Sequence, residues 1–351
     1  MIERSYRVGD HVFTVALEEP WKFMQYTAPV AARIERAAAG EELPIVPTRA
    51  GDEVPARTFV QGKEDLPEAM DRNTLDFSQY EPFRVEMPGQ DDKTPLFRLT
   101  VRAGEPAWIA AGKADGSVKK IMSVDDRPPF YYIYEHEGAT LYEFDAAQGK
   151  IAGTLWVSAG HDEAEYFPKP GFGPYTTMFQ LSTALMILYT YNAAAHETLL
   201  MHASVVRHEG LANLFLGVSG TGKSTHSRLW LNAIEGCDLV NDDNPVLRFK
   251  DNRLYVYGTP WSGKTPCYRN LSVPVRALVR LDQAPRNEAK PLTGLSAYAS
   301  ILPAASGIRW NRAIMDAITA TVEKVVTQVP CYHLDCLPDL DAARTCRTAI
   351  E

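Results

Sequence analysis

The segment GVSGTGKST (217–225) constrains this chain more than any other, because it contains the G-x-x-x-x-G-K-[ST] pattern of a phosphate-binding loop. The residues NLFLG before it form a short apolar run typical of a strand, and KSTHSRLWLNAI after it has helical spacing. A strand, this loop and a helix in that order are the context in which the pattern binds phosphate. We therefore expect a nucleotide-binding domain of the α/β class around these residues.

The residue types in the loop predict how it would hold a nucleotide. Glycines let backbone N–H groups turn toward the phosphates, and the helix N-terminus adds a partial positive charge. Lys223 would reach the β- and γ-phosphates, and Ser224 would offer its hydroxyl to the metal. The expected nucleotide-binding residues of the loop are Gly217, Ser219, Gly220, Thr221, Gly222, Lys223, Ser224 and Thr225. The expected cofactors are ATP and Mg²⁺, or Mn²⁺ in its place.

Two carboxylates follow at the end of the next apolar run, CDLVNDD (237–243). In such a pair, one carboxylate can bind the metal while the other accepts a proton from an attacking hydroxyl. Asp242 and Asp243 are adjacent and should couple, so the pKa of one is expected to rise. An Asp-rich turn before the next strand is the structural alternative. Beside a phosphate loop, we favour the functional role.

A histidine lies upstream of the loop, in LLMHASVVRHEGLANLFLG (199–217). This segment predicts two strands that join at Glu209-Gly210 and lead into the loop. His202 is on the first of them, 21 residues before Lys223. Adjacent strands lie about 4.8 Å apart, so a neighbouring strand can bring His202 beside the phosphates. The alternative is a histidine with a structural role only, which forms hydrogen bonds to neighbouring groups.

Taken together, MHASVV, LFLGVSGTGKST and LVNDD resemble the HPr kinase/phosphorylase and ATP-type phosphoenolpyruvate carboxykinase superfamily, over about residues 198–265. The resemblance implies a phosphate loop that follows an antiparallel hairpin. It implies that Asp242 is the general base and that Asp243 is closer to the metal. The catalytic residues implied are Asp242, His202 and Lys223, and the metal ligands implied are Ser224, Asp243 and His202.

The segment after the Asp pair differs from both families. HPr kinases have an Arg-Gly-Gly-like turn for phosphorolysis there, whereas this chain has VYGTPWSGKTPCYRN (256–270). Some kinase-like proteins linked to peptide modification carry a segment similar to its GTPWSGK. By analogy with a carboxykinase loop, Lys264 is a candidate nucleotide-binding residue, although the segment could be only a turn. Candidates for neutralising transition-state charge are Arg269, Arg309 and Arg312, with surface or packing roles as the alternative.

The first half of the chain predicts a β-rich architecture. YRVGDHVFTVAL (6–17) indicates a hairpin, and PVAARIERAAAGE (29–41) a short helix that stops at a glycine. Residues 42–93 are rich in turn formers and predict long loops. Strand-like runs between Pro95 and Tyr166, AWIAAG (107–112) among them, predict an antiparallel sheet. We expect a β-rich N-terminal domain (1–170) and a P-loop kinase-like domain (171–351), an α/β fold that is α+β overall.

Charge and hydropathy exclude several partners. The chain has 36 basic and 44 acidic residues and no basic block, so nucleic acid is not an expected partner. Residues 171–195 carry no charge, but threonines and other polar residues interrupt the run, which favours a buried helix over a membrane span. The N-terminus has no apolar signal region, and the five cysteines have no zinc or disulfide spacing. We therefore expect a cytoplasmic protein with no membrane partner, which could form a homo-oligomer.

The pattern as a whole favours an ATP-dependent kinase. It would transfer the γ-phosphoryl to a hydroxyl of an unknown acceptor, such as a Ser of a protein or peptide, or a small molecule. Two alternatives stay open: a lyase of the carboxykinase type, and a nucleotide-binding sensor that does not turn over.

Overall fold

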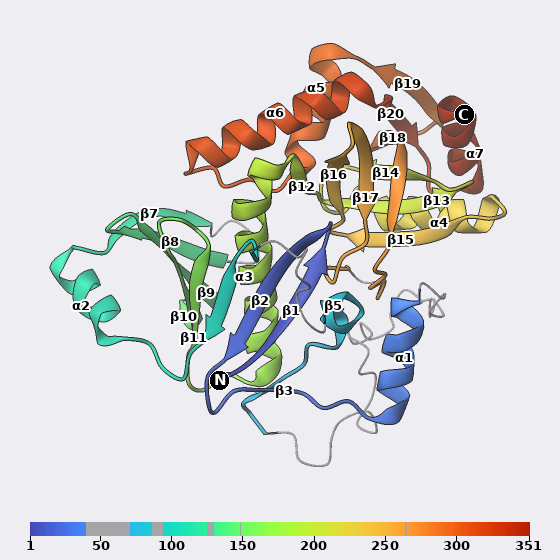
Figure 1. Ribbon diagram of the computed structural model, residues 1–351. Helices are drawn as coiled ribbons and strands as arrows, with labels where there is room; N and C mark the ends of the chain where they lie inside the picture. Colours follow the sequence, from blue (N-terminus) through green and yellow to red (C-terminus); the bar gives the residue numbers. More distant parts are fainter. Residues whose placement is uncertain (40–70, 86–93, 125–129, 148, 264) are drawn as a thin grey trace. The chain divides into compact units, whose positions relative to one another are not determined.

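The computed structural model describes residues 1–39, 71–85, 94–124, 130–147, 149–263 and 265–351 (Figure 1). The chain divides into two compact units, and each is considered by itself. The first comprises Met1–Pro29 and Gly62–Asn192, and the second comprises Val30–Gln61 and Ala193–Glu351. Both contain helices and strands, so the fold is mixed, in agreement with the α+β class expected from the sequence.

A nine-stranded sheet runs through the described part of the first unit, in the order β5-β1-β2-β6-β11-β10-β9-β8-β7. Its strands are β1 (Ile2–Val8), β2 (His11–Leu17), β5 (Arg84–Val85), β6 (Arg98–Val101), β7 (Lys119–Val124), β8 (Phe130–His136), β9 (Ala139–Ala147), β10 (Lys150–Val157) and β11 (Glu163–Pro168). The predicted β1–β2 hairpin is present. The sheet is antiparallel except around β6, which pairs parallel with both β2 and β11.

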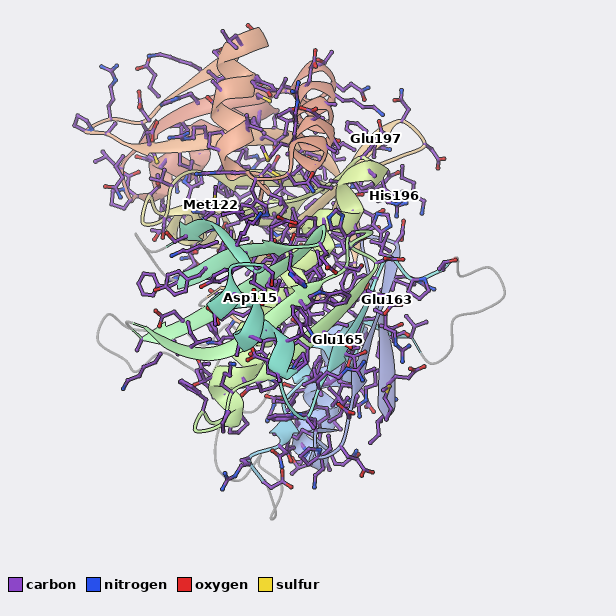
Figure 2. The ribbon with its side chains drawn as sticks, turned by 90° about the vertical axis from the view of Figure 1, so that its left-hand side faces the viewer. Asp115, Met122, Glu163, Glu165, His196 and Glu197 are labelled. Carbon is purple, nitrogen blue, oxygen red and sulfur yellow. The ribbon has the colours of Figure 1, made fainter. Side chains whose placement is uncertain are left out.

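Strand alternation sets which side chains of this sheet are buried. On β11, Ala164 and Tyr166 are buried, whereas Glu163 and Glu165, two residues apart, share the other face (Figure 2). The remaining elements of the chain before the second sheet are α1 (Ala28–Ala38), β3 (Lys22–Phe23), β4 (Thr74–Leu75), η2 (Ser78–Phe83), α2 (Ala107–Asp115) and α3 (Pro174–Ala193). Most of the expected loop region 42–93 lies outside the described residues.

The run AWIAAG, predicted as a strand, is instead the start of helix α2. Short apolar runs do not distinguish strand from helix by periodicity, and alanine has the highest helix propensity. Gly116, at φ 82°, ends the helix in the left-handed conformation that glycine adopts readily. Ile109 is buried in a small cluster with Leu141 and Phe167, so tertiary packing supports the helix.

Helix α3 belongs to the first unit, whereas the sequence placed the domain boundary before it, near residue 170. Its buried polar side chains bond to the sheet of that unit. Tyr166 Oη donates to Gln180 Oε1 at 3.0 Å, and the hydroxyls of Tyr142 and Tyr191 lie 2.7 Å apart. The uncharged run is therefore a packed helix. No described helix has the length and apolar character needed to cross a membrane.

The second unit is built on a mixed sheet whose main path is β12-β16-β17-β18-β14-β13-β15, with β20 and β19 continuing beside β18. Its strands are β12 (Thr198–Leu200), β13 (Ala203–His208), β14 (Leu211–Leu216), β15 (Asp238–Asp243), β16 (Val246–Lys250), β17 (Arg253–Tyr257), β18 (Ser272–Gln283), β19 (Glu288–Leu292) and β20 (Cys331–Cys336). Its helices are η3 (Ala194–His196), α4 (Lys223–Ala233), α5 (Gly294–Ile301), η4 (Leu302–Ala304), α6 (Arg312–Gln328) and α7 (Leu340–Ile350).

Helices pack on both sides of the central strands of this unit (Figure 1). On one side, α4 and α7 enclose a core around Phe215 and Trp230. On the other, α5 and α6 cover a larger core that includes Leu214 and Val322. Strands β13, β14 and β18 are consequently buried on both faces, and they provide a rigid base for the loop that follows β14.

Candidate nucleotide-binding site

Strand register brings the predicted site residues together. Strands β13 and β14 form the expected hairpin, and β15 pairs with the other edge of β13. Ala203 therefore lies opposite Leu216 on one side and Asp243 on the other. His202, directly before Ala203, is placed between the start of the glycine-rich loop and the Asp pair.

The loop from Gly217 to Gly222 is a tight turn that leads into α4. The backbone N–H and the hydroxyl of Thr221 both donate to the carbonyl of Val218, at 3.2 and 2.7 Å. Gly222 caps α4 at φ 105°, and Gly217 has φ 154° with a carbonyl of β18 only 3.2 Å from where a Cβ would stand. Side chains are strained in such conformations, so the loop needs glycine at both positions.

The remaining loop residues are open to a ligand. Ser219, Gly220 and Thr225 are exposed, and Ser224 is half-buried in the first turn of α4. Backbone N–H groups at the N-terminus of a helix are an anion-binding arrangement. The loop and α4 therefore form a glycine-rich turn that leads into a helix N-terminus, and phosphate binding there stays a prediction.

Lys223 is buried against this loop. Its Nζ donates to the carbonyl oxygens of Gly217 at 2.9 Å and Val218 at 3.3 Å, and it contacts His202 Nε2 at 2.8 Å. The pKa of Lys223 is lowered, because the effect of burial is larger than that of the Asp243 and Asp242 carboxylates, which raise the pKa. The ammonium is thus held at the loop by groups that a phosphate oxygen would compete with.

His202 joins the lysine to the Asp pair. Its Nδ1 lies 3.1 Å from Asp243 Oδ1, and its Nε2 faces the Lys223 ammonium. An ammonium has donors only, so Nε2 accepts from Lys223 and the Nδ1–H donates to Asp243. His202 therefore links Lys223 and Asp243 in one chain of polar contacts. A metal-ligand role for Nε2, which the family resemblance implied, would require its contact with Lys223 to break.

Asp242 is buried, with 3% of its surface exposed. Its Oδ1 accepts a hydrogen bond from Ser204 Oγ at 2.8 Å, and Ser204 Oγ lies 2.6 Å from Ser227 Oγ. Its Oδ2 is buried without a well-formed hydrogen bond to any described residue. One oxygen is thus fixed by hydroxyls, and the other is left to take a proton or to bind a cation.

The pKa of Asp242 is raised, and burial is the main cause. The neighbouring Asp243 carboxylate adds to the rise, while nearby hydroxyls, those of Ser204, Thr265 and Ser224, lower it. The sequence predicted a raised pKa from coupling between the two carboxylates. In the structure, the larger part of the rise in the pKa of Asp242 comes from desolvation, which the spacing of residues in the sequence does not reveal.

This raised pKa makes a prediction for stability. The folded protein holds a proton on Asp242 more tightly than the unfolded chain does, so this contribution is full below the usual carboxyl value of 3.8 and is lost as pH rises through the folded pKa. The Asp242→Asn variant has no carboxyl group at this position, so it does not lose this part of its stability as pH rises. The Tm of the variant should therefore rise relative to that of the wild type as pH increases above the usual carboxyl value of 3.8, in scans without nucleotide or metal. A Tm difference that does not change with pH would contradict this.

The segment GTPWSGK folds back along the Asp pair. The Gly263 N–H donates to the carbonyl of Asp242 at 2.9 Å, and Ser262 forms an isolated bridge with Asp243. A Cβ on Gly263 would stand 2.6 Å from that carbonyl oxygen, so only glycine fits there. The candidate Lys264 lies outside the described residues.

Hydrogen bonds of buried polar side chains fix the position of the GTPWSGK segment. Thr259 Oγ1 donates a hydrogen bond to the carbonyl of Asn244 at 2.7 Å. It accepts a hydrogen bond from Nδ2 of the buried Asn241 at 3.1 Å. Sequence reasoning missed Ser204, Ser227, Asn241 and Thr259. The spacing of Ser204, two residues after His202 on a strand, was the one signal available for them.

The three candidate arginines differ in their surroundings. Arg269 is buried, and its guanidinium binds Asp238 at 2.8 Å and the carbonyl of Leu239 at 2.5 Å, which is a packing role. Arg309 is exposed, and the side chain of Arg312 is 94% exposed beside Asp316 on α6.

Oxygen atoms beside the loop suit a hard divalent cation. The Ser224 hydroxyl, the Asp243 carboxylate and the unpaired Asp242 Oδ2 are the ligand types that Mg²⁺ prefers. Elsewhere in the described residues, His208, Glu209 and Glu351 have the spacing of metal ligands. Both of those carboxylates bind Arg276 at 3.2 Å, so that guanidinium already occupies them and offsets part of their charge.

The chain is similar to one protein-family model and to solved structures. A family model described as SynChlorMet cassette protein ScmC matches residues 174–337, which include the loop and the Asp pair. The structure of the HPr(Ser) kinase/phosphatase from Coxiella burnetii is similar at 16% identity and a TM-score of 0.27, covering 43% of this chain and 95% of that one. No curated protein matches the chain. Neither of the two matches is to a carboxykinase.

Proposed function

We propose that the chain is an ATP-dependent phosphotransferase with an HPr-kinase-like catalytic unit, which moves the γ-phosphoryl of ATP to a hydroxyl. One observation carries the proposal. A glycine-rich loop with a buried lysine follows β14, and a carboxylate pair ends β15. His202, directly before the strand β13 that lies between them, connects Lys223 to Asp243. The buried Asp242, whose Oδ2 has no hydrogen-bond partner among the described residues, supplies a group that can take the acceptor proton.

The residues divide the work as follows. Backbone N–H groups of the loop and the Lys223 ammonium hold the β- and γ-phosphates. The acceptor oxygen forms a bond to the γ-phosphorus, the bond to the β–γ bridging oxygen breaks, and ADP leaves. The acceptor proton passes to Asp242 Oδ2, while Ser204 keeps Oδ1 in place. His202 keeps Lys223 and Asp243 oriented.

Ser224 and Asp243 are the groups that would hold Mg²⁺, which leaves Asp242 Oδ2 to accept the proton. When bound, Mg²⁺ would neutralise charge on the phosphates. Burial raises the pKa of Asp242 above its usual carboxyl value, which makes its carboxylate a stronger base.

Two assays test the proposal. First, thermal shift with ATP or ADP and Mg²⁺ should show stabilisation through ligand linkage, and no shift with any purine nucleotide would contradict it. Second, ADP formation is followed with a panel of serine peptides and small alcohols, and separately with oxaloacetate. Acceptor-dependent ADP supports the kinase. Oxaloacetate-dependent ADP would instead indicate a lyase, and binding without any turnover would indicate a sensor.

A further inference from the structure

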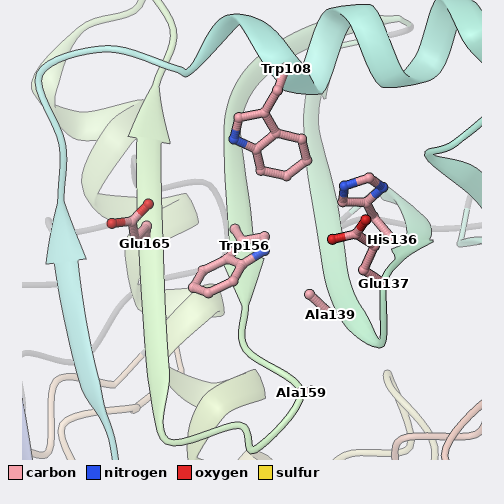
Figure 3. Close-up of a pocket in the computed structure, with 7 residues that line it drawn as sticks. All are labelled: Trp108, His136, Glu137, Ala139, Trp156, Ala159 and Glu165. Atoms are coloured by element: carbon pink, nitrogen blue, oxygen red, sulfur yellow. The ribbon is translucent and has the colours of Figure 1, made fainter.

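A pocket lies in the first unit, at the sheet of that unit and beside helix α2. Its volume is about 510 Å³. It is lined by Trp108, His136, Glu137, Ala139, Trp156, Ala159 and Glu165 (Figure 3). The proposed phosphotransferase reaction uses none of these residues.

Aromatic rings line this pocket on two sides. Trp108, at the start of α2, is 39% exposed and stacks on His136 with ring centroids 4.9 Å apart. Trp156, on β10, packs against the small core that contains Ile109 and Leu141. Figure 3 shows the two indoles on either side of an open space. An exposed tryptophan held in place by a ring contact is a surface that favours a flat or cationic ligand.

The charges of the lining are all negative. Its seven residues include two carboxylates and neither lysine nor arginine. Glu165 lies opposite Trp156 across the β10–β11 pair and accepts from Arg102 Nε at 2.8 Å. Glu137, at the β8–β9 turn with φ 50°, has no ion pair with any described residue. A cation in the pocket would therefore meet an available carboxylate as well as two indole faces.

We propose that this pocket binds the guanidinium group of an arginine side chain in a peptide or protein. A guanidinium is planar and weakly hydrated, so it can stack on an indole while its N–H groups point to a carboxylate. An ammonium is more strongly hydrated and has no flat face to stack. A neutral ligand of the same shape could still donate to Glu137, but it would lose the attraction between opposite charges.

The test uses the full chain and Nα-acetyl-arginine amide as the probe, with ¹⁵N-labelled indole signals as the readout. Only the indole signals of Trp108 and Trp156, assigned with single Trp→Phe variants, should shift in a saturable way. The matching citrulline amide, which is neutral, should bind at least about 10-fold more weakly. Free arginine serves as a second arm, and weaker binding of it than of the amide supports a peptide ligand.

Variants separate the two contributions. Trp108→Ala should lower affinity by about 3- to 30-fold, since a cation over an indole accounts for that range. Glu137→Gln should lower it by about 2- to 5-fold, and added salt should reduce the difference. Glu163→Gln is the matched control, because Glu163 is exposed on β11 and does not line the pocket. Glu137 is exposed at a turn, so its substitution leaves the core intact.

Three results would overturn the proposal. They are equal binding of the arginine and citrulline amides, shifts confined to other indoles, and no saturable shift up to millimolar probe. Equal binding of free arginine and the amide would redirect the site from peptides to the free amino acid and overturn the peptide part.

Discussion

Asp242→Asn is expected to lower the rate of phosphoryl transfer by about 10²–10⁴-fold while ATP–Mg²⁺ binding survives. The asparagine keeps the size of the side chain, and its oxygen can still accept from Ser204, which bonds the aspartate at 2.8 Å. It cannot take the acceptor proton at the Oδ2 position. The measurement is single-turnover ADP formation with a saturating acceptor, together with nucleotide affinity from thermal shift.

Two companion variants make this result specific. Asp316→Asn changes a 70% exposed aspartate on α6 and should leave both readouts as in the wild type. Asp243→Asn removes charge that would face the cation and should raise the Mg²⁺ concentration needed for half-maximal rate. If Asp242→Asn and Asp243→Asn abolish nucleotide binding equally, the pair is a single metal site and the base lies elsewhere.

Lys223→Ala should weaken ATP binding by at least about 10- to 100-fold, because hydrogen bonds to charged groups contribute about 1.5–3 kcal/mol each. The substitution removes the ammonium that the loop carbonyls and His202 hold in place. It also leaves His202 Nε2 without its donor. Thermal-shift titrations with ATP and Mg²⁺ measure the effect as a lost or right-shifted stabilisation.

Lys290→Ala is the matched control for the lysine. Its ammonium is 54% exposed on β19 and pairs only with Glu288 among the contacts seen. ATP affinity should be unchanged in this variant. Equal affinity in Lys223→Ala and the wild type would remove the loop lysine from nucleotide binding and, with it, the proposed phosphate site.

The parts of the site that sequence predicted are those coded by short patterns. The loop at Gly217–Thr225, the hairpin turn at Glu209-Gly210 and strand β15 with its Asp pair lie where we expected them. Each depends on local chemistry: glycine conformations, alternation of apolar residues, and a polar strand end. The position of His202 followed from pairing two strands that are adjacent in sequence.

Other features depend on contacts between distant residues. Ser204 and Ser227 meet because β13 packs beneath α4, and burial rather than sequence spacing raises the pKa of Asp242. The strand prediction for AWIAAG was wrong because packing of Ile109 selects a helix. Helix α3 bonds to tyrosine hydroxyls on distant strands of the first unit. An uncharged run in the sequence does not predict these contacts.

A crystal structure with a non-hydrolysable ATP analogue and Mg²⁺ is the measurement that tests the central claim most directly. We expect the β- and γ-phosphates to lie within hydrogen-bond distance of Lys223 Nζ and of the backbone N–H groups of the 217–225 loop. We also expect the cation to lie between the phosphates and the Ser224 and Asp243 oxygens. An analogue bound away from this loop, or phosphates that contact neither Lys223 nor the loop N–H groups, would contradict the claim.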